Sequence, residues 1–175
     1  WEMHKMNIFT KSILKVFKGA FKAFQTFPVT IASALAFSIV TIIRIHLDWP
    51  QQEAYNFLFN CLHWSFALGA IFSLATITAA KSRYGEGKAF FIANLLGIVA
   101  VAVTFFALYF FGATKQNLPE YRYAMVSSLA AGRVSAALFV SFIAFIILAG
   151  YPKDQSDFSR SFFMTHKAFF IALLY

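Results

Sequence analysis

The chain has 175 residues, of which 60% are hydrophobic and only 13% charged, and 24 of them are Phe. A water-soluble globule of this size cannot bury so much apolar surface, so the composition excludes an ordinary soluble domain and favours lipid as the solvent. The net charge of +8 does not indicate nucleic-acid binding, since the basic residues lie between apolar runs rather than along one soluble face. We therefore expect the phospholipid bilayer as a partner, and no nucleic acid.

The first predicted element is a basic amphipathic helix from Phe9 to Phe27. At about 100° per residue its lysines fall in one narrow stripe, and bulky apolar side chains cover the opposite arc. This segregation is typical of a helix lying at a lipid surface, with residues 1–27 forming a cytoplasmic or interfacial segment. The lysines predicted to contact lipid headgroups are Lys11, Lys15, Lys18 and Lys22.

Four long apolar runs follow, and together they predict an all-α, polytopic transmembrane helix bundle over residues 28–175. Each run is long enough to span ~30 Å of hydrocarbon at ~1.5 Å per residue. An acidic turn, residues 48–53, precedes the second run, and a basic loop, residues 81–88, follows it. The predicted spans are residues 28–47, 55–80, 90–111 and 124–150. A fifth run begins at about residue 168 and stops well short of the ~20 residues that a span needs, so we expect the N-terminal part of a longer protein.

The distribution of Lys and Arg predicts the orientation of the spans. Eleven of these residues lie before the first span, between the second and third, and after the fourth, whereas three lie in the segments on the other side. Cytoplasmic loops retain positive charge, so we expect a cytoplasmic N-terminus in the inner or plasma membrane.

Small residues recur every four positions in the fourth run, at Ser128, Gly132 and Ala136. Such a stripe lets another helix approach closely. We expect it to pack against another transmembrane helix, either of the same longer protein or of a partner.

Arg133 is the one charge inside the fourth run, and burying an arginine in a membrane costs about 2.5–3.5 kcal/mol on the insertion scale. It predicts an intramembrane polar site, a substrate or headgroup contact with Asn60, His63 and Asn94 as its neighbours. The alternative is that Arg133 snorkels outward and that the asparagines serve as hydrogen-bonding glue between helices.

A second possible site combines His46, Asp48 and His63 near the outer face. Their spacing resembles no zinc-binding helix, and no nucleotide-binding, nucleophile-elbow or CxxC motif is present. We therefore predict no catalytic residue, metal or cofactor, and interpret these histidines as interfacial groups bonded to backbone or water. The single cysteine, Cys61, excludes an intrachain disulfide and is interpreted as a small buried hydrophobe.

Two stretches, GAFKAFQTFPVT at residues 19–30 and SFFMTHKAFF at residues 161–170, carry a likeness to known sequences, together with Arg122, Tyr123 and the fourth run. They resemble an uncharacterised family of bacterial polytopic membrane proteins, a domain of unknown function. The resemblance implies a longer protein with about a dozen spans of ~20 residues each, and it carries over no catalytic residue. The chain departs from the family pattern at His166, where Asn is expected.

These observations favour a non-enzymatic membrane module that senses or scaffolds through partner helices. One alternative is a transporter or permease for a small or lipidic solute, with Arg133 in its path. Another is an enzyme acting on a lipid-linked substrate at the outer face through His46, Asp48 and His63.

Overall fold

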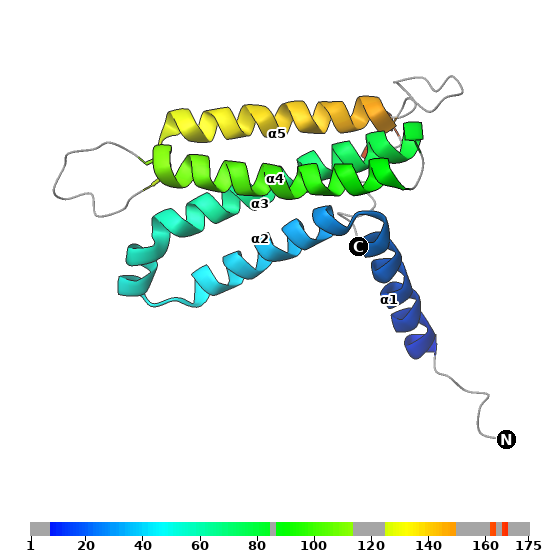
Figure 1. Ribbon diagram of the computed structural model, residues 1–175. Coiled ribbons are helices and arrows are strands. Elements are labelled where there is room, and N and C mark those ends of the chain that lie inside the picture. The colour runs from blue at the N-terminus through cyan, green and yellow to red at the C-terminus, as the bar shows by residue number, and fades with distance from the viewer. Residues whose placement is uncertain (1–7, 85–86, 114–124, 150–161, 164–165, 168–175) are drawn as a thin grey trace.

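The computed structural model describes residues 8–84, 87–113, 125–149, 162–163 and 166–167. Its elements are helices, as the composition and periodicity predict, and a single isolated bridge joins Ala113 to Val126 within the described residues. The named helices are α1 (Ile8–Thr26), α2 (Pro28–His46), α3 (Trp49–Tyr84), α4 (Lys88–Phe111) and α5 (Ser128–Ala149). Helices α2 to α5 run side by side, and α1 leaves the bundle at a steep angle to α2 (Figure 1).

Four helices are long and apolar enough to cross a membrane: Pro28–His46, Tyr55–Tyr84, Lys88–Phe111 and Ser128–Ala149. Their outward faces carry many large apolar side chains, such as Ile45, Phe110 and Phe139. Exposed apolar surface on this scale needs a lipid solvent, and helices satisfy every interior backbone hydrogen bond without water. The structure therefore supports a multi-pass membrane protein.

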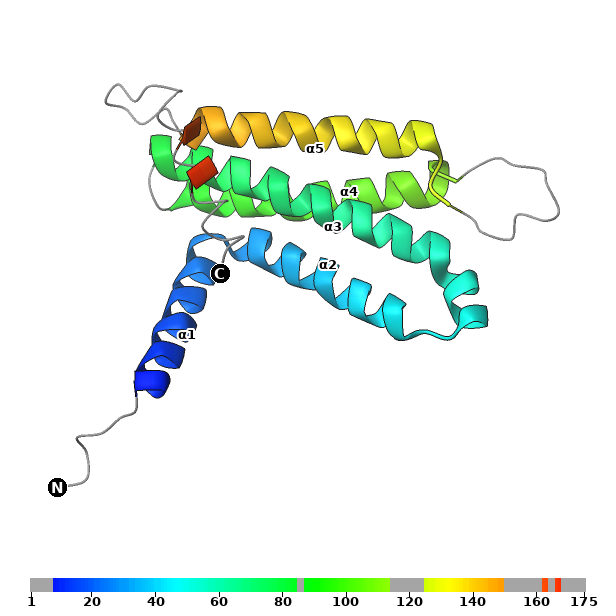
Figure 2. The same cartoon turned by 180° about the vertical axis from the view of Figure 1, so that it is seen from behind.

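Helix α3 is the centre of the bundle. It packs against α2, α4 and α5, and it lies between α5 and α2 in Figure 2. Among the described residues the fully buried side chains are all on α3, spaced by multiples of four residues along an inclined row: Cys61, Ser65, Ser73 and Ile77. Gly69 completes this series and is also buried. We call Cys61, Ser65, Gly69 and Ser73 the α3 stripe.

The α3 stripe allows a close approach of backbones. A Cβ atom at Gly97 of α4 would lie 2.7 Å from the Cβ atom of Ser73, and one at Gly69 would overlap Val101. Ser73 also contacts α2, since its Oγ lies 2.8 Å from the Oγ1 of Thr30. Small side chains thus hold α2, α3 and α4 together, the packing mode expected where lipid removes the hydrophobic driving force between helices.

The elbow between α1 and α2 is centred on Phe27 and Pro28. Phe27 has φ −135° and ψ 62°, outside the helical region, and Pro28 opens α2 where a missing N–H costs nothing. The last turn of α1 is closed by Thr26, whose Oγ1 donates to the Lys22 carbonyl at 2.8 Å.

Helix boundaries differ from expectation at both ends of α3. The predicted acidic turn at residues 48–53 is wrong from Trp49 onward, because Pro50 falls in the first turn of a helix, where proline is tolerated. The loop predicted to start at residue 81 is also shorter, since α3 continues to Tyr84. Gly87, which precedes α4, has a positive φ of 133°.

Helix α5 starts at Ser128 rather than at residue 124. Ser127 caps it by accepting the Ala130 N–H on its Oγ at 3.3 Å, and the Ser127 N–H donates to the Gly112 carbonyl at 2.7 Å. This bond to Gly112 and the bridge between Ala113 and Val126 join the start of α5 to the end of α4. The predicted fifth span, from about residue 168, lies outside the described residues.

Candidate functional site

The two ends of the bundle differ in the elements that they hold. The α1 end holds the elbow, the end of α3 and the start of α4, and the distal end holds the end of α2 and the start of α5 (Figure 1).

A polar cluster ties α2 to α3 near the distal end. Arg44 on α2 donates from Nη2 to the Oδ1 of Asn56 at 2.5 Å and from Nη1 to the Oδ1 of Asn60 at 3.3 Å. The Nδ2 of Asn60 donates to the Oδ1 of Asn56 at 3.4 Å. We call Arg44, Asn56 and Asn60 the Arg44 cluster. Its amide oxygens face the guanidinium, so the arrangement stabilises a cation inside an apolar bundle.

His63 of α3 also contacts α2, about one helical turn closer to the centre of the bundle than the Arg44 cluster. Its Nε2 lies 2.9 Å from the Oγ1 of Thr41, which also donates to the Phe37 carbonyl at 2.9 Å. A hydroxyl has one proton, so while Thr41 donates to the Phe37 carbonyl it accepts from His63, and in this arrangement the proton of the imidazole is on Nε2. The Phe37 ring covers the imidazole at a centroid distance of 4.8 Å.

Arg133 does not take part in these polar contacts between α2 and α3. It is exposed on α5 and borders a groove of about 290 Å³ formed with α3 and α4, where Leu68, Thr104 and Ala137 also lie. In the described part of the chain no hydrogen bond joins Arg133 to Asn60, His63 or Asn94. The structure thus places Asn60 and His63 against α2, and Arg44 occupies the position that the sequence analysis gave to Arg133.

Asn94 lies on α4 and turns back on its own helix. Its Nδ2 donates to the Phe90 carbonyl at 2.9 Å, and its buried Oδ1 has no hydrogen-bond partner among the described residues. It therefore does not join the Arg44 cluster, and it does not act as glue between helices within the described residues.

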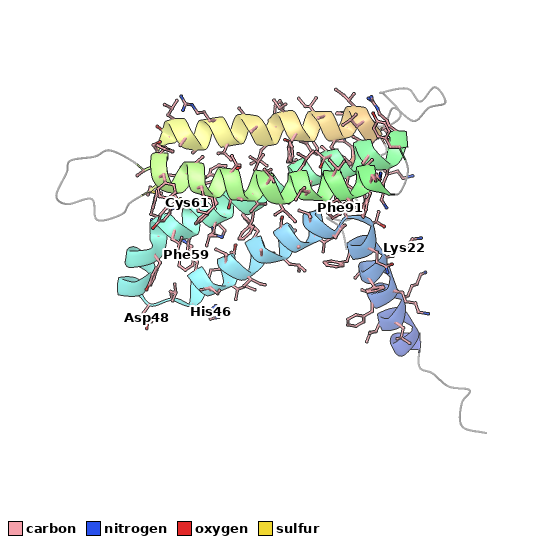
Figure 3. All side chains as sticks on the ribbon, viewed as in Figure 1. Lys22, His46, Asp48, Phe59, Cys61 and Phe91 are labelled. Carbon is pink, nitrogen blue, oxygen red and sulfur yellow. The ribbon has the colours of Figure 1, made fainter. Side chains whose placement is uncertain are left out.

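Of the three residues considered for chemistry at the outer face, the two histidines have separate partners. The Nδ1 of His46 lies 2.8 Å from the Ile42 carbonyl of its own helix, whereas His63 pairs with Thr41. His46 and Asp48 are both exposed at the distal end (Figure 3). Among the described residues no group of three His, Cys, Asp or Glu side chains converges as metal ligands would.

The predicted packing stripe on α5 is exposed. Ser128, Gly132 and Ala136 all face outward, and a Cβ atom at Gly132 would meet nothing within 4 Å in the described part of the chain. The residues that pack closely inside the bundle are those of the α3 stripe, which the sequence analysis missed. Small residues recur every four positions there as well, so the pattern that was applied to residues 128–136 also predicts the α3 stripe.

The basic face of α1 is exposed at Lys15, Lys18 and Lys22, and the side chain of Lys11 lies outside the described part. Lys22 points away from α2 (Figure 3). Phe17 and Phe21, on the opposite arc, are 69% and 65% exposed, far more than a packed aromatic side chain. Within the described residues, helix α1 thus presents an uncovered apolar face opposite its lysines.

A groove of about 570 Å³ opens between α2, α3 and α4, and we call it the α2–α4 groove. Phe24 of α1 lines the groove next to the elbow. The other lining residues are Pro28, Val29, Ala32, Ser33, Ala36, Leu62, Ser65, Phe66, Ile98, Val101, Ala102 and Phe105.

Comparison of the chain with family models, with curated proteins and with solved structures gives no match. The resemblance to a bacterial polytopic family therefore stays a prediction.

Proposed function

We propose that this chain is a non-enzymatic module of a bacterial inner or plasma membrane, which senses or scaffolds by binding further transmembrane helices through α5. The observation that carries this proposal is the exposed stripe of Ser128, Gly132 and Ala136. A helix needs small residues on a face only where another backbone comes close, and within the described residues none does.

The neighbours of the stripe support a helix-binding face. Leu129 and Phe139, on the same side of α5, are each 65% exposed and would flank an incoming helix. Small residues between large ones form the kind of hole into which side chains of a second helix fit. The α3 stripe uses the same device inside the bundle.

The charge distribution supports a cytoplasmic α1 end. Lys22 of α1, Lys81 and Arg83 of α3, and Lys88 of α4 all belong to this end, whereas Arg44 and Arg133 lie toward the distal end. Since cytoplasmic loops retain positive charge, the elbow and α1 face the cytoplasm.

The test is the assembly state of the full-length protein in native membranes, measured by cross-linking and by native electrophoresis in a mild detergent. Gly132→Leu fills the stripe and is expected to abolish most of the assembled species. Phe139→Leu is the matched control, because it keeps a large apolar side chain on the same face, and it should retain assembly. An unchanged assembly in Gly132→Leu would reject the proposal.

A transporter for a small or lipidic solute is the second candidate. It is favoured by the position of Arg133, a cation bordering the groove between α3, α4 and α5. A solute path would expose this position to water, so Arg133→Cys should react with a membrane-impermeant thiol reagent. A cysteine there that stays unmodified, while one at the exposed position 48 reacts, would exclude the path.

A further inference from the structure

We infer that the α2–α4 groove holds one acyl chain of an anionic phospholipid whose headgroup lies at the level of the lysines of α1. The groove has no lining residue from α5, so this inference does not rest on the proposed helix-binding face.

The size of the groove suits a hydrocarbon chain. Its 570 Å³ lies within the range of about 300–1,000 Å³ that ligand sites occupy. Along α2 the wall runs from Pro28 to Ala36, about 12 Å at ~1.5 Å per residue. The groove thus accommodates about 12 Å of one extended acyl chain.

The chemistry of the walls excludes a polar occupant. Only two of the lining residues, Ser33 and Ser65, carry polar side chains, and the Oγ of Ser65 already donates to the Leu62 carbonyl at 2.9 Å. A polar ligand would lose its hydration without gaining partners, whereas each methylene buried here gains free energy.

The groove opens sideways, toward the surface that faces lipid. Ala32 on α2 and Ile98 and Ala102 on α4 line it and are all exposed. Two of these three rim residues are alanines, so a chain can enter from the bilayer without displacing a large side chain from the core.

Charge identifies the lipid. Phe24, a residue of α1, lines the groove, so the groove reaches the basic helix. Lys22 precedes Phe24 by two residues and therefore lies on the opposite arc of α1, with Lys15 and Lys18 in the same stripe, and α1 contains no acidic residue. An anionic headgroup at this level gains about fivefold in binding per nearby lysine, which a zwitterionic headgroup does not. A helix in the groove would leave this charge pattern without a role.

The first measurement uses the full-length wild-type protein in nanodiscs of equal parts phosphatidylglycerol and phosphatidylcholine, followed by native mass spectrometry of the lipids that stay bound. Phosphatidylglycerol is expected to be retained at least about fivefold over phosphatidylcholine. The triple substitution Lys15→Gln, Lys18→Gln, Lys22→Gln should remove this preference and leave apolar retention intact. Equal retention of the two lipids by the wild type would overturn the inference.

The second measurement blocks the groove. Ala32→Trp places an indole in the groove and should lower lipid retention at least about fivefold, by excluding methylenes from the wall. Ala34→Trp, exposed on the same helix but outside the groove, is the matched control. Ala102→Trp blocks the opposite wall should Ala32→Trp fail to fold. Unchanged lipid retention in the folded blocked variants overturns the inference, and a simultaneous loss of assembly would assign the groove to a helix.

Discussion

The α3 stripe and the stripe on α5 have the same spacing and nearly the same composition, yet one is buried and the other exposed. Gly69 and Ser73 of α3 meet Val101 and the Gly97 backbone region of α4, whereas Gly132 of α5 meets nothing in the described residues. A repeat of small residues therefore tells which face permits a close approach, but it does not tell whether the neighbour belongs to the same bundle.

The largest expected effect separates the two glycines. Gly97→Ala puts a Cβ atom 2.7 Å from that of Ser73 and 3.0 Å from Val29, and it should lower the free energy of unfolding by about 1–3 kcal/mol. Gly132→Ala meets open space and gains helix propensity, so it should be neutral or stabilising by up to about 1 kcal/mol. Unfolding in mixed micelles, followed by circular dichroism, compares them. Equal losses in the two variants would contradict the distinction between the stripes.

A smaller effect tests whether the Arg44 cluster stabilises the bundle in addition to the α3 stripe. Asn56→Leu removes an acceptor from Arg44 and should destabilise the bundle by about 1–2 kcal/mol. Asn94→Leu removes an amide whose Oδ1 has no partner in the described residues, so it should cost nothing or stabilise. The same unfolding assay applies, and a larger loss for Asn94→Leu would mean that the Arg44 cluster does not hold α2 to α3.

The smallest effect concerns one hydroxyl at the edge of the α3 stripe. The Oγ1 of Thr76 reaches the Ala93 carbonyl of α4 at 3.3 Å, but its single proton is shared with two carbonyls of its own helix at 3.1 and 3.2 Å. Thr76→Val should therefore cost only about 0.6 kcal/mol. Thr78→Val is the control, since its buried Oγ1 has no partner in the described part of the chain, and this variant should gain stability. The two variants are compared by chemical denaturation in one detergent, and the reverse order would contradict the assignment.

Hydropathy predicted the spans because length and apolarity are properties of each segment alone. The all-α fold follows from this, and so does the buried position of Cys61, which packs with Leu108 and Val134. The helix ends were harder to predict, because Pro50 and Lys81 to Tyr84 are tolerated both inside and outside a helix.

The polar pairs depend on the register between two helices, which the sequence of one helix alone does not determine. Thr41 with His63 and Arg44 with Asn60 are successive contacts of one antiparallel pair of helices. The charge of Arg44 in the last turn of α2, taken alone, suits a helix C-terminus in the headgroup layer. Once the turn at Leu47 and Asp48 is placed, the same residue falls opposite the asparagines. The rotation of α5 depends on its docking to α3, so the position of Arg133 could not be predicted from its own sequence.

Helix α2 has 19 residues, about 28 Å at ~1.5 Å per residue, whereas the apolar part of α3 has 30 residues and is about 45 Å long. In a hydrocarbon layer of about 30 Å, α3 must tilt or extend beyond it, while α2 barely reaches both surfaces. A thicker bilayer therefore creates hydrophobic mismatch at α2 before any other span. Because α2 is bound to α3 at one end and joined to α1 at the other, that mismatch would act on the elbow at Phe27.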